Sequence, residues 1–182
     1  MTERSEIAQG IQLEAPHLWI PWDMTMAEFI QVFADHTQAA PRLVSPGYYV
    51  ARCQLLRGLV AQVGFHFEPS DTAGRLNELE LFDNGERDIE QSYRLFHERL
   101  VRVFGEPSKH RTGALGTSMP DCQWRIGSVT IVHYVMDRFG PEEHLRFRKG
   151  RAIFPVMRPL LTAFVVALLA LFYLWWSWEW HP

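Results

Sequence analysis

The sequence predicts an α+β fold in which an antiparallel sheet carries two amphipathic helices on one face, followed by a single C-terminal transmembrane helix. Strand-like segments come in runs and do not alternate with helices, which argues against a parallel doubly wound sheet. Two stretches place apolar residues at helical spacing. The segment 160–178 is nineteen residues long and contains no charge, glycine or proline, which is typical of a membrane span.

The first predicted helix begins at the capping box Thr25 to Glu28 and ends before Pro41. It follows a short strand-like segment at 17–22. Its apolar face has i, i+3, i+4 and i+7 spacing: Met26, Phe29, Ile30 and Phe33. Because residues 40–47 contain two prolines and a glycine, we expect a loop there.

Three strands are predicted next, at 48–56, 59–67 and 76–82, forming an antiparallel meander. A second helix should run from Asp88 to Phe104, since Gly105 and then Pro107 prevent continuation. Its apolar stripe is Ile89, Tyr93, Phe96, Leu100 and Val103. After a polar loop at 108–120, three further strands are expected at 122–126, 128–136 and 143–149, and no internal repeat is visible.

These elements predict four segments along the chain. They are a flexible N-terminus at 1–15, a cytoplasmic α+β domain at 16–149, a basic juxtamembrane stem at 150–158 and a transmembrane helix at 159–180. At about 1.5 Å per residue, the uncharged stretch spans roughly 30 Å of hydrocarbon. Aromatic residues suited to the membrane interface gather at its far end: Tyr173, Trp175, Trp176, Trp178 and Trp180.

Basic residues flank only the near end of this span: Arg146, Arg148, Lys149, Arg151 and Arg158. Since such residues stay on the cytoplasmic side, we expect the N-terminal domain in the cytoplasm of a bacterial cell and a single pass through the inner membrane. No signal peptide precedes the domain, so the topology would be tail-anchored. Cys53 and Cys122 are then expected as reduced thiols that fit no metal or redox motif.

Charge argues against nucleic acid as a partner. Residues 1–145 carry 13 Lys and Arg against 20 Asp and Glu, a net charge of −7, whereas phosphate binding needs basic clusters. The sequence also lacks the nucleophile, phosphate-binding, dinucleotide and zinc-protease motifs. We therefore predict a protein that is not an enzyme, with no catalytic residue, cofactor or metal.

Six polar residues are nevertheless candidates for a site: His66, Glu68, His133, Glu142, Glu143 and His144. His66 and Glu68 lie two apart on a strand and so on one face, which can hold a metal but is also typical of a polar strand edge. His133 lies mid-strand among apolar residues, where a hydrogen-bonded core histidine is expected. The run 142–144 is either an acid/base cluster or a solvated turn.

Residues 58–147 resemble small bacterial proteins of the immunity and antitoxin-like kind. The resemblance rests on the strand pair GLVAQVGFHF and GRLNELELF, the helix SYRLFHERLVRVFGEP, and the hairpin CQWRIGSVTIVHY. It implies a non-catalytic domain that binds one protein partner, such as a cognate secreted toxin. The alternatives are an accessory or regulatory subunit of an inner-membrane complex, and a membrane-associated hydrolase or transferase that uses His66, Glu68, His133 or His144.

Overall fold

The computed structural model describes residues 6–68, 74–83, 88–112, 119–137 and 141–150. Eight strands form one antiparallel sheet in the order β3-β4-β5-β6-β10-β9-β8-β7, and β1 pairs with β2 in a separate hairpin. The elements are β1 Gly10–Gln12, β2 Trp19–Pro21, α1 Met26–Val32, the 3-10 helix η1 Thr37–Ala39, β3 Arg42–Ser45, β4 Tyr48–Ala51, β5 Val60–Phe67, β6 Leu76–Asp83, α2 Ile89–Phe104, β7 Lys109–Arg111, β8 Asp121–Ile126, β9 Val129–Asp137 and β10 Pro141–Lys149.

Both predicted helices are confirmed, together with the local signals that start and stop them. The Thr25 side chain accepts a hydrogen bond from the Glu28 N–H, and the Glu28 carboxylate accepts one from the Thr25 N–H at 2.8 Å. At α2, the Asp88 carboxylate caps the Gln91 N–H at 2.9 Å. The helix ends at Gly105, whose φ of 79° favours a residue without a side chain.

The strands differ from the prediction at the sheet edges. β3 and β7 lie in segments predicted as loops, because strands of three or four exposed residues show no buried alternation in the sequence. β1 lies in the segment predicted as a flexible N-terminus, where Ile7, Ile11 and Leu13 are buried. The longer strands β5, β6, β8, β9 and β10 lie close to their predicted positions.

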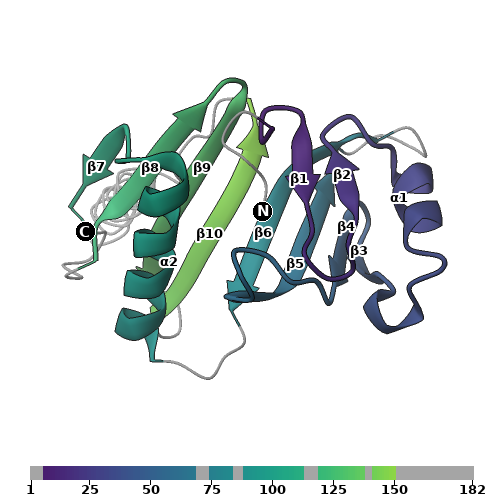
Figure 1. The fold of residues 1–182 in the computed structure, drawn as a ribbon, viewed down its shortest axis with the longest axis horizontal. Helices are drawn as coiled ribbons and strands as arrows, with labels where there is room; N and C mark the ends of the chain where they lie inside the picture. Colours follow the sequence, from purple (N-terminus) through teal and green to yellow (C-terminus); the bar gives the residue numbers. More distant parts are fainter. Residues whose placement is uncertain (1–5, 69–73, 84–87, 113–118, 138–140, 151–182) are drawn as a thin grey trace, which may run out of the picture. The chain divides into compact units, whose positions relative to one another are not determined.

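The two helices and the β1–β2 hairpin all lie on the same face of the sheet (Figure 1). Phe29 of α1 packs on Phe65 of β5 with ring centroids 4.7 Å apart. The hairpin lies between the helices and contributes Ile11, Ile20 and Trp22 to one continuous core. Each such fully buried side chain contributes about 1.5–3 kcal/mol by leaving water. We call the opposite side of the sheet, which carries Tyr48, Glu80 and Arg146, the open face.

The sheet consists of two halves with the same element order, a repeat that the sequence did not reveal. One helix followed by four antiparallel strands occurs twice, as α1 with β3–β6 and as α2 with β7–β10. The last strands of the halves, β6 and β10, pair at the centre, with Glu80 opposite Arg146. An approximate two-fold axis passes between Glu80 and Arg146 and makes Leu79 equivalent to Leu145. Phe65, which pairs with Leu79, is therefore equivalent to His133, which pairs with Leu145.

The predicted fold class is corrected in two respects. The described chain is mainly antiparallel β, with two α-helices set against an eight-stranded sheet, and not a balanced α+β fold. None of its helices is long and apolar enough to cross a bilayer. The predicted span at 159–180 lies outside the described residues, so nothing in the structure supports the transmembrane helix, the tail anchor or the inner-membrane location, and we withdraw all three.

Candidate functional site

A cluster of charged and aromatic side chains surrounds Glu80 near the centre of the open face. The Glu80 carboxylate accepts hydrogen bonds from Arg146 Nη2 at 2.8 Å and from the Tyr48 hydroxyl at 3.3 Å. His66 Nε2 lies 3.5 Å from one of its oxygens, and His144 Nδ1 lies 3.4 Å from the other. We call Tyr48, His66, Glu78, Glu80, His144 and Arg146 the Glu80 cluster.

Strand register and one glycine build this cluster. Tyr48 and His66 are directly opposite each other in β4 and β5, and their rings stack with centroids 4.1 Å apart. The Tyr48 ring also lies over Gly64, where a β-carbon would come within 2.8 Å of the ring. Glycine at this position therefore lets Tyr48 reach across β5 to the carboxylate on β6.

The surroundings of Glu80 keep its carboxylate charged. Burial by itself raises the pKa of Glu80, but the hydrogen bond with His144, the nearby His66 imidazole and the charge of Arg146 outweigh it and hold this pKa well below its ordinary value. Burial and the neighbouring carboxylate raise the pKa of Tyr48 to about 12. A general acid or base works best with a pKa near the working pH, so the Glu80 carboxylate by itself is a poor proton carrier.

Three of the basic residues predicted to flank a membrane span belong to β10. Arg146 forms ion pairs with Glu78 at 3.2 Å and Glu80 at 2.8 Å, and Arg148 lies 3.7 Å from Glu78. Lys149 is the last residue of the strand. Arg146 and Arg148 are thus paired with carboxylates of β6 and do not act as free basic residues beside a membrane span. Arg151, Arg158 and the aromatic residues Tyr173, Trp175, Trp176, Trp178 and Trp180 lie outside the described residues.

The predicted candidates separate into different environments. His66 and His144 meet at Glu80, a residue that sequence reasoning missed, and His144 also lies 3.7 Å from Glu142. Glu68 is exposed just beyond β5, where its backbone N–H bonds Arg75. Only the strand register, which places β5 and β10 on either side of β6, brings the two histidines to one carboxylate.

His133 and Glu143 form a separate pair beneath α2. His133 is fully buried, and its Nε2 lies 2.6 Å from the Glu143 carboxylate. The Tyr93 ring stacks on the imidazole at 4.2 Å, where the equivalent position in the first half holds the Phe29–Phe65 pair. The Tyr93 hydroxyl donates to the Pro120 carbonyl and lies 3.6 Å from the sulfur of Cys122. The second half thus has a polar cluster where the first half has apolar rings.

A cavity of about 470 Å³ lies at the N-terminal end of α2 next to this pair. Its polar lining includes Glu142, Glu143 and His144, while Leu81, Phe96 and Leu145 are among its apolar walls. The structure therefore places the candidate run 142–144 at one cavity. Among the described residues no group of three or more His, Cys, Asp or Glu side chains has the geometry to hold a metal ion.

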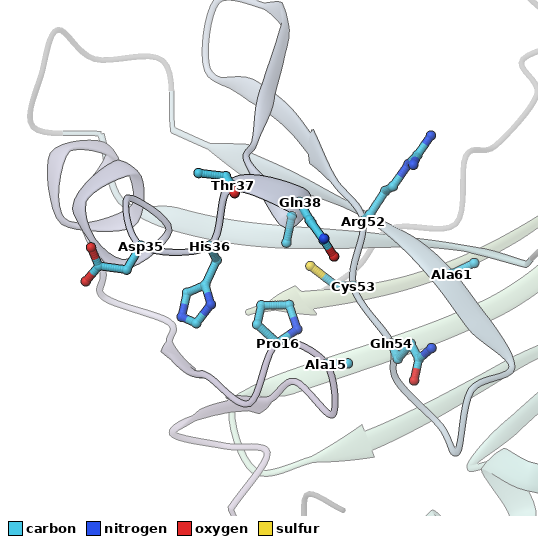
Figure 2. Close-up of a pocket in the computed structure, with 11 residues that line it drawn as sticks. Ala15, Pro16, Asp35, His36, Thr37, Gln38, Arg52, Cys53, Gln54 and Ala61 are labelled. Atoms are coloured by element: carbon cyan, nitrogen blue, oxygen red, sulfur yellow. The ribbon is translucent and has the colours of Figure 1, made fainter.

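Another cavity, of about 790 Å³, lies at the start of β3 on the helix-bearing side of the sheet (Figure 2). Its wall combines small residues with polar ones: Ala15, Pro16, Asp35, His36, Thr37, Gln38, Ala39, Arg52, Cys53, Gln54 and Ala61. Burial raises the pKa of Cys53 to about 12 and also raises the pKa of Cys122. Both thiols are free and buried, so neither is an activated nucleophile.

The two edges of the sheet differ sharply in character. At the β3 edge, Arg42–Ser45, all four residues are exposed, including Leu43 at 56% and Val44 at 46%. At the other edge, β7 presents the basic sequence Lys109, His110 and Arg111. Leu43 and His110 occupy equivalent positions in the two halves. Leu43 pairs with Tyr49 of β4, and His110 pairs with the equivalent residue of β8, Cys122. Sequence reasoning missed the β3 edge because it assigned residues 40–47 to a loop.

No protein-family model matches the chain, and no curated protein matches it. A solved structure, that of a DUF4309 family protein (YjgB) from Bacillus subtilis subsp. subtilis str. 168, is similar at 14% identity with a TM-score of 0.44. The similarity covers 81% of this chain and 93% of that chain. At this level the likeness carries no conclusion about function.

Proposed function

We propose that this chain is a protein-binding domain that accepts an extended segment of a partner protein as an added strand along the β3 edge. The observation that carries this proposal is the exposure of Leu43 and Val44 on a terminal strand of the sheet. Within the described residues no strand pairs with the outer side of β3. Its backbone N–H and C=O groups on that side can therefore pair with a partner.

The contrast with β7 supports the same proposal. Natural sheets block unwanted strand addition with charged edge residues, above all lysine. β7 has this protection in Lys109, His110 and Arg111, whereas β3 has apolar residues at the centre of its edge. Because both edges occupy equivalent positions in the two halves, the difference lies in their side chains and not in the architecture.

The ionised state of Glu80 also favours binding over catalysis, because a carboxylate fixed by Arg146 and two histidines is a poor proton carrier. The expectation of a protein partner is therefore retained as a proposal, and a secreted toxin is its most specific version. That partner is a different polypeptide, not a second copy of this chain.

Photo-cross-linking in the native cell tests this function. A photoreactive residue is placed at Leu43 in the full chain, and at His110 in a matched control. We expect a discrete product at position 43, identified by mass spectrometry as this chain joined to another polypeptide, and its loss when Val44→Lys is added. Equal products at both positions, no product at all, or a product containing only this chain would each overturn the proposal.

A further inference from the structure

We infer, resting on the proposed function, that the segment bound along β3 alternates acidic residues with bulky apolar residues. Successive side chains of a strand point to opposite faces of a sheet. An added strand therefore presents one set of side chains to the open face and the other to the helix-bearing face. The two faces next to β3 are chemically different, and each selects its own set.

The open-face side of this edge is positively charged. Arg42 pairs in register with Val50, which lies in line with Gly64 and Glu80, so its side chain begins on the open-face side. Arg52 lies one residue beyond β4 and is also among the residues that line the cavity next to this edge. Both side chains are exposed, and neither forms an ion pair within the described part of the chain. Acidic side chains of an added strand would lie beside these two guanidinium groups, which bind carboxylates strongly.

The helix-bearing side offers space for a bulky side chain. The 790 Å³ cavity opens where the β3–β4 ladder ends, between η1 and the segment 52–54. Figure 2 shows the Cys53 sulfur directed into it, with His36 and Pro16 across from it and the Asp35 carboxylate directed away. The small side chains of Ala15, Ala39 and Ala61 leave this volume unfilled. An aromatic or large aliphatic side chain of the added strand, placed just past Leu43 along the edge, fits into this cavity.

The edge strand β3 of a second copy does not offer this chemistry, and the alternating segment 78–81 of β6 is already paired on both sides within the sheet. The β3 strand reads Arg-Leu-Val-Ser and contains no carboxylate that could pair with Arg42 or Arg52. The occupant we infer is therefore a segment of another protein.

Labelled synthetic peptides and fluorescence anisotropy test the inference on the full chain. The probe is a short peptide of alternating Glu and Phe, and matched peptides carry Lys for Glu or Ala for Phe. We expect the Glu and Phe peptide to bind and each replacement to weaken its Kd by about tenfold. In the chain, Arg52→Glu should reverse the preference for Glu over Lys, while Arg94→Glu, an exposed site on α2, should not.

The cavity has its own variant. Ala61→Trp should abolish the advantage of Phe over Ala in the peptide, and Ala27→Trp on the exposed side of α1 should leave it unchanged. Unfolding curves show whether each variant is folded. If Ala61→Trp does not fold, the charge reversal at Arg52 still decides the test.

The outcomes separate this inference from the function on which it rests. If Val44→Lys weakens every peptide but the Glu and Lys peptides bind equally well, strand addition stands and the acidic and apolar pattern is overturned. If peptides bind and Val44→Lys has no effect, the β3 edge is not the site and both are overturned. Absence of binding by all the peptides would likewise overturn both.

Discussion

Glu80 and Arg146 face each other across the central strand pair, and their 2.8 Å ion pair lies at the axis that relates the two halves of the sheet. The same carboxylate also contacts Tyr48 and His66 from the first half and His144 from the second. One acidic side chain thereby links its own strand, β6, to three others, β4, β5 and β10. The halves are joined on the open face by charge, and on the helix-bearing face by Leu79, Leu81, Leu145 and Phe147.

Replacing Glu80 with Gln should destabilise the fold by about 1–3 kcal/mol, because among the described residues it leaves the Arg146 guanidinium with Glu78 alone as a charged partner. Urea unfolding measures the change. Glu98→Gln on the exposed side of α2 is the matched control and should change stability little. Equal stability of Glu80→Gln and the wild type would show that the ion pair contributes no net stabilisation.

Stability should fall in acid because of the same residue. The folded pKa of Glu80 lies below its unfolded value, so its contribution is complete above about pH 4.3 and is lost as the pH falls toward the folded pKa. The wild type should therefore lose more stability between neutral pH and acid than Glu80→Gln does. Parallel curves of unfolding free energy against pH for the two proteins would contradict this.

Gly64→Ala should displace Tyr48 and destabilise the fold by about 1 kcal/mol, since the added β-carbon lies 2.8 Å from the ring. The displaced ring would lose its hydrogen bond to Glu80 and its stacking on His66. In a Tyr48→Ala background the same change should cost nothing, or stabilise by restricting the unfolded chain. Unfolding of the single and double variants measures this, and additive effects would refute the steric cause.

His133 and Glu143 should be strongly coupled. His133→Phe leaves the Glu143 carboxylate, which is only 13% exposed, without its partner at 2.6 Å. Glu143→Leu leaves the buried imidazole of His133 without that carboxylate. We expect each single variant to cost about 1–3 kcal/mol and the double variant less than their sum. A double-mutant cycle from urea unfolding gives the coupling, and a coupling near zero would mean that the contact contributes nothing.

Both thiols should react slowly with a maleimide near neutral pH. Burial raises the pKa of Cys53 to about 12 and raises that of Cys122, so almost no thiolate is present and access is blocked. In urea, two labels per chain should appear quickly by mass spectrometry. Rapid labelling of the folded protein would show local opening at one of these positions.

Sequence reasoning predicted those parts of the fold that depend on nearby residues. The capping box at Thr25 and the glycine stop at Gly105 act within one helical turn, and β10 alternates buried Leu145 and Phe147 with more exposed residues. The strands β3 and β7 were not predicted, because their three or four exposed residues give no such signal. The equivalence of the two halves was not predicted either, because the halves share an order of strands and not a pattern of residues.

The candidate site was predicted only as separate residues. His66 was predicted as half of a pair with Glu68 and His144 as part of the run 142–144, but their common partner Glu80 depends on the register of three strands. Arg146 was read as part of a membrane flank because its charge was counted without its partners. Ion pairs between residues more than sixty positions apart leave no local pattern in a sequence.

The unequal edges of the sheet limit how this protein can assemble. On the proposed function the β3 edge accepts a strand, while the basic edge at β7 disfavours becoming the next acceptor. Head-to-tail growth would need an acceptor edge and a compatible donor edge on every subunit. If β3 accepts a strand as proposed, addition to this sheet stops after a single event, and a stable complex forms without the polymerisation that an open sheet with two receptive edges would risk.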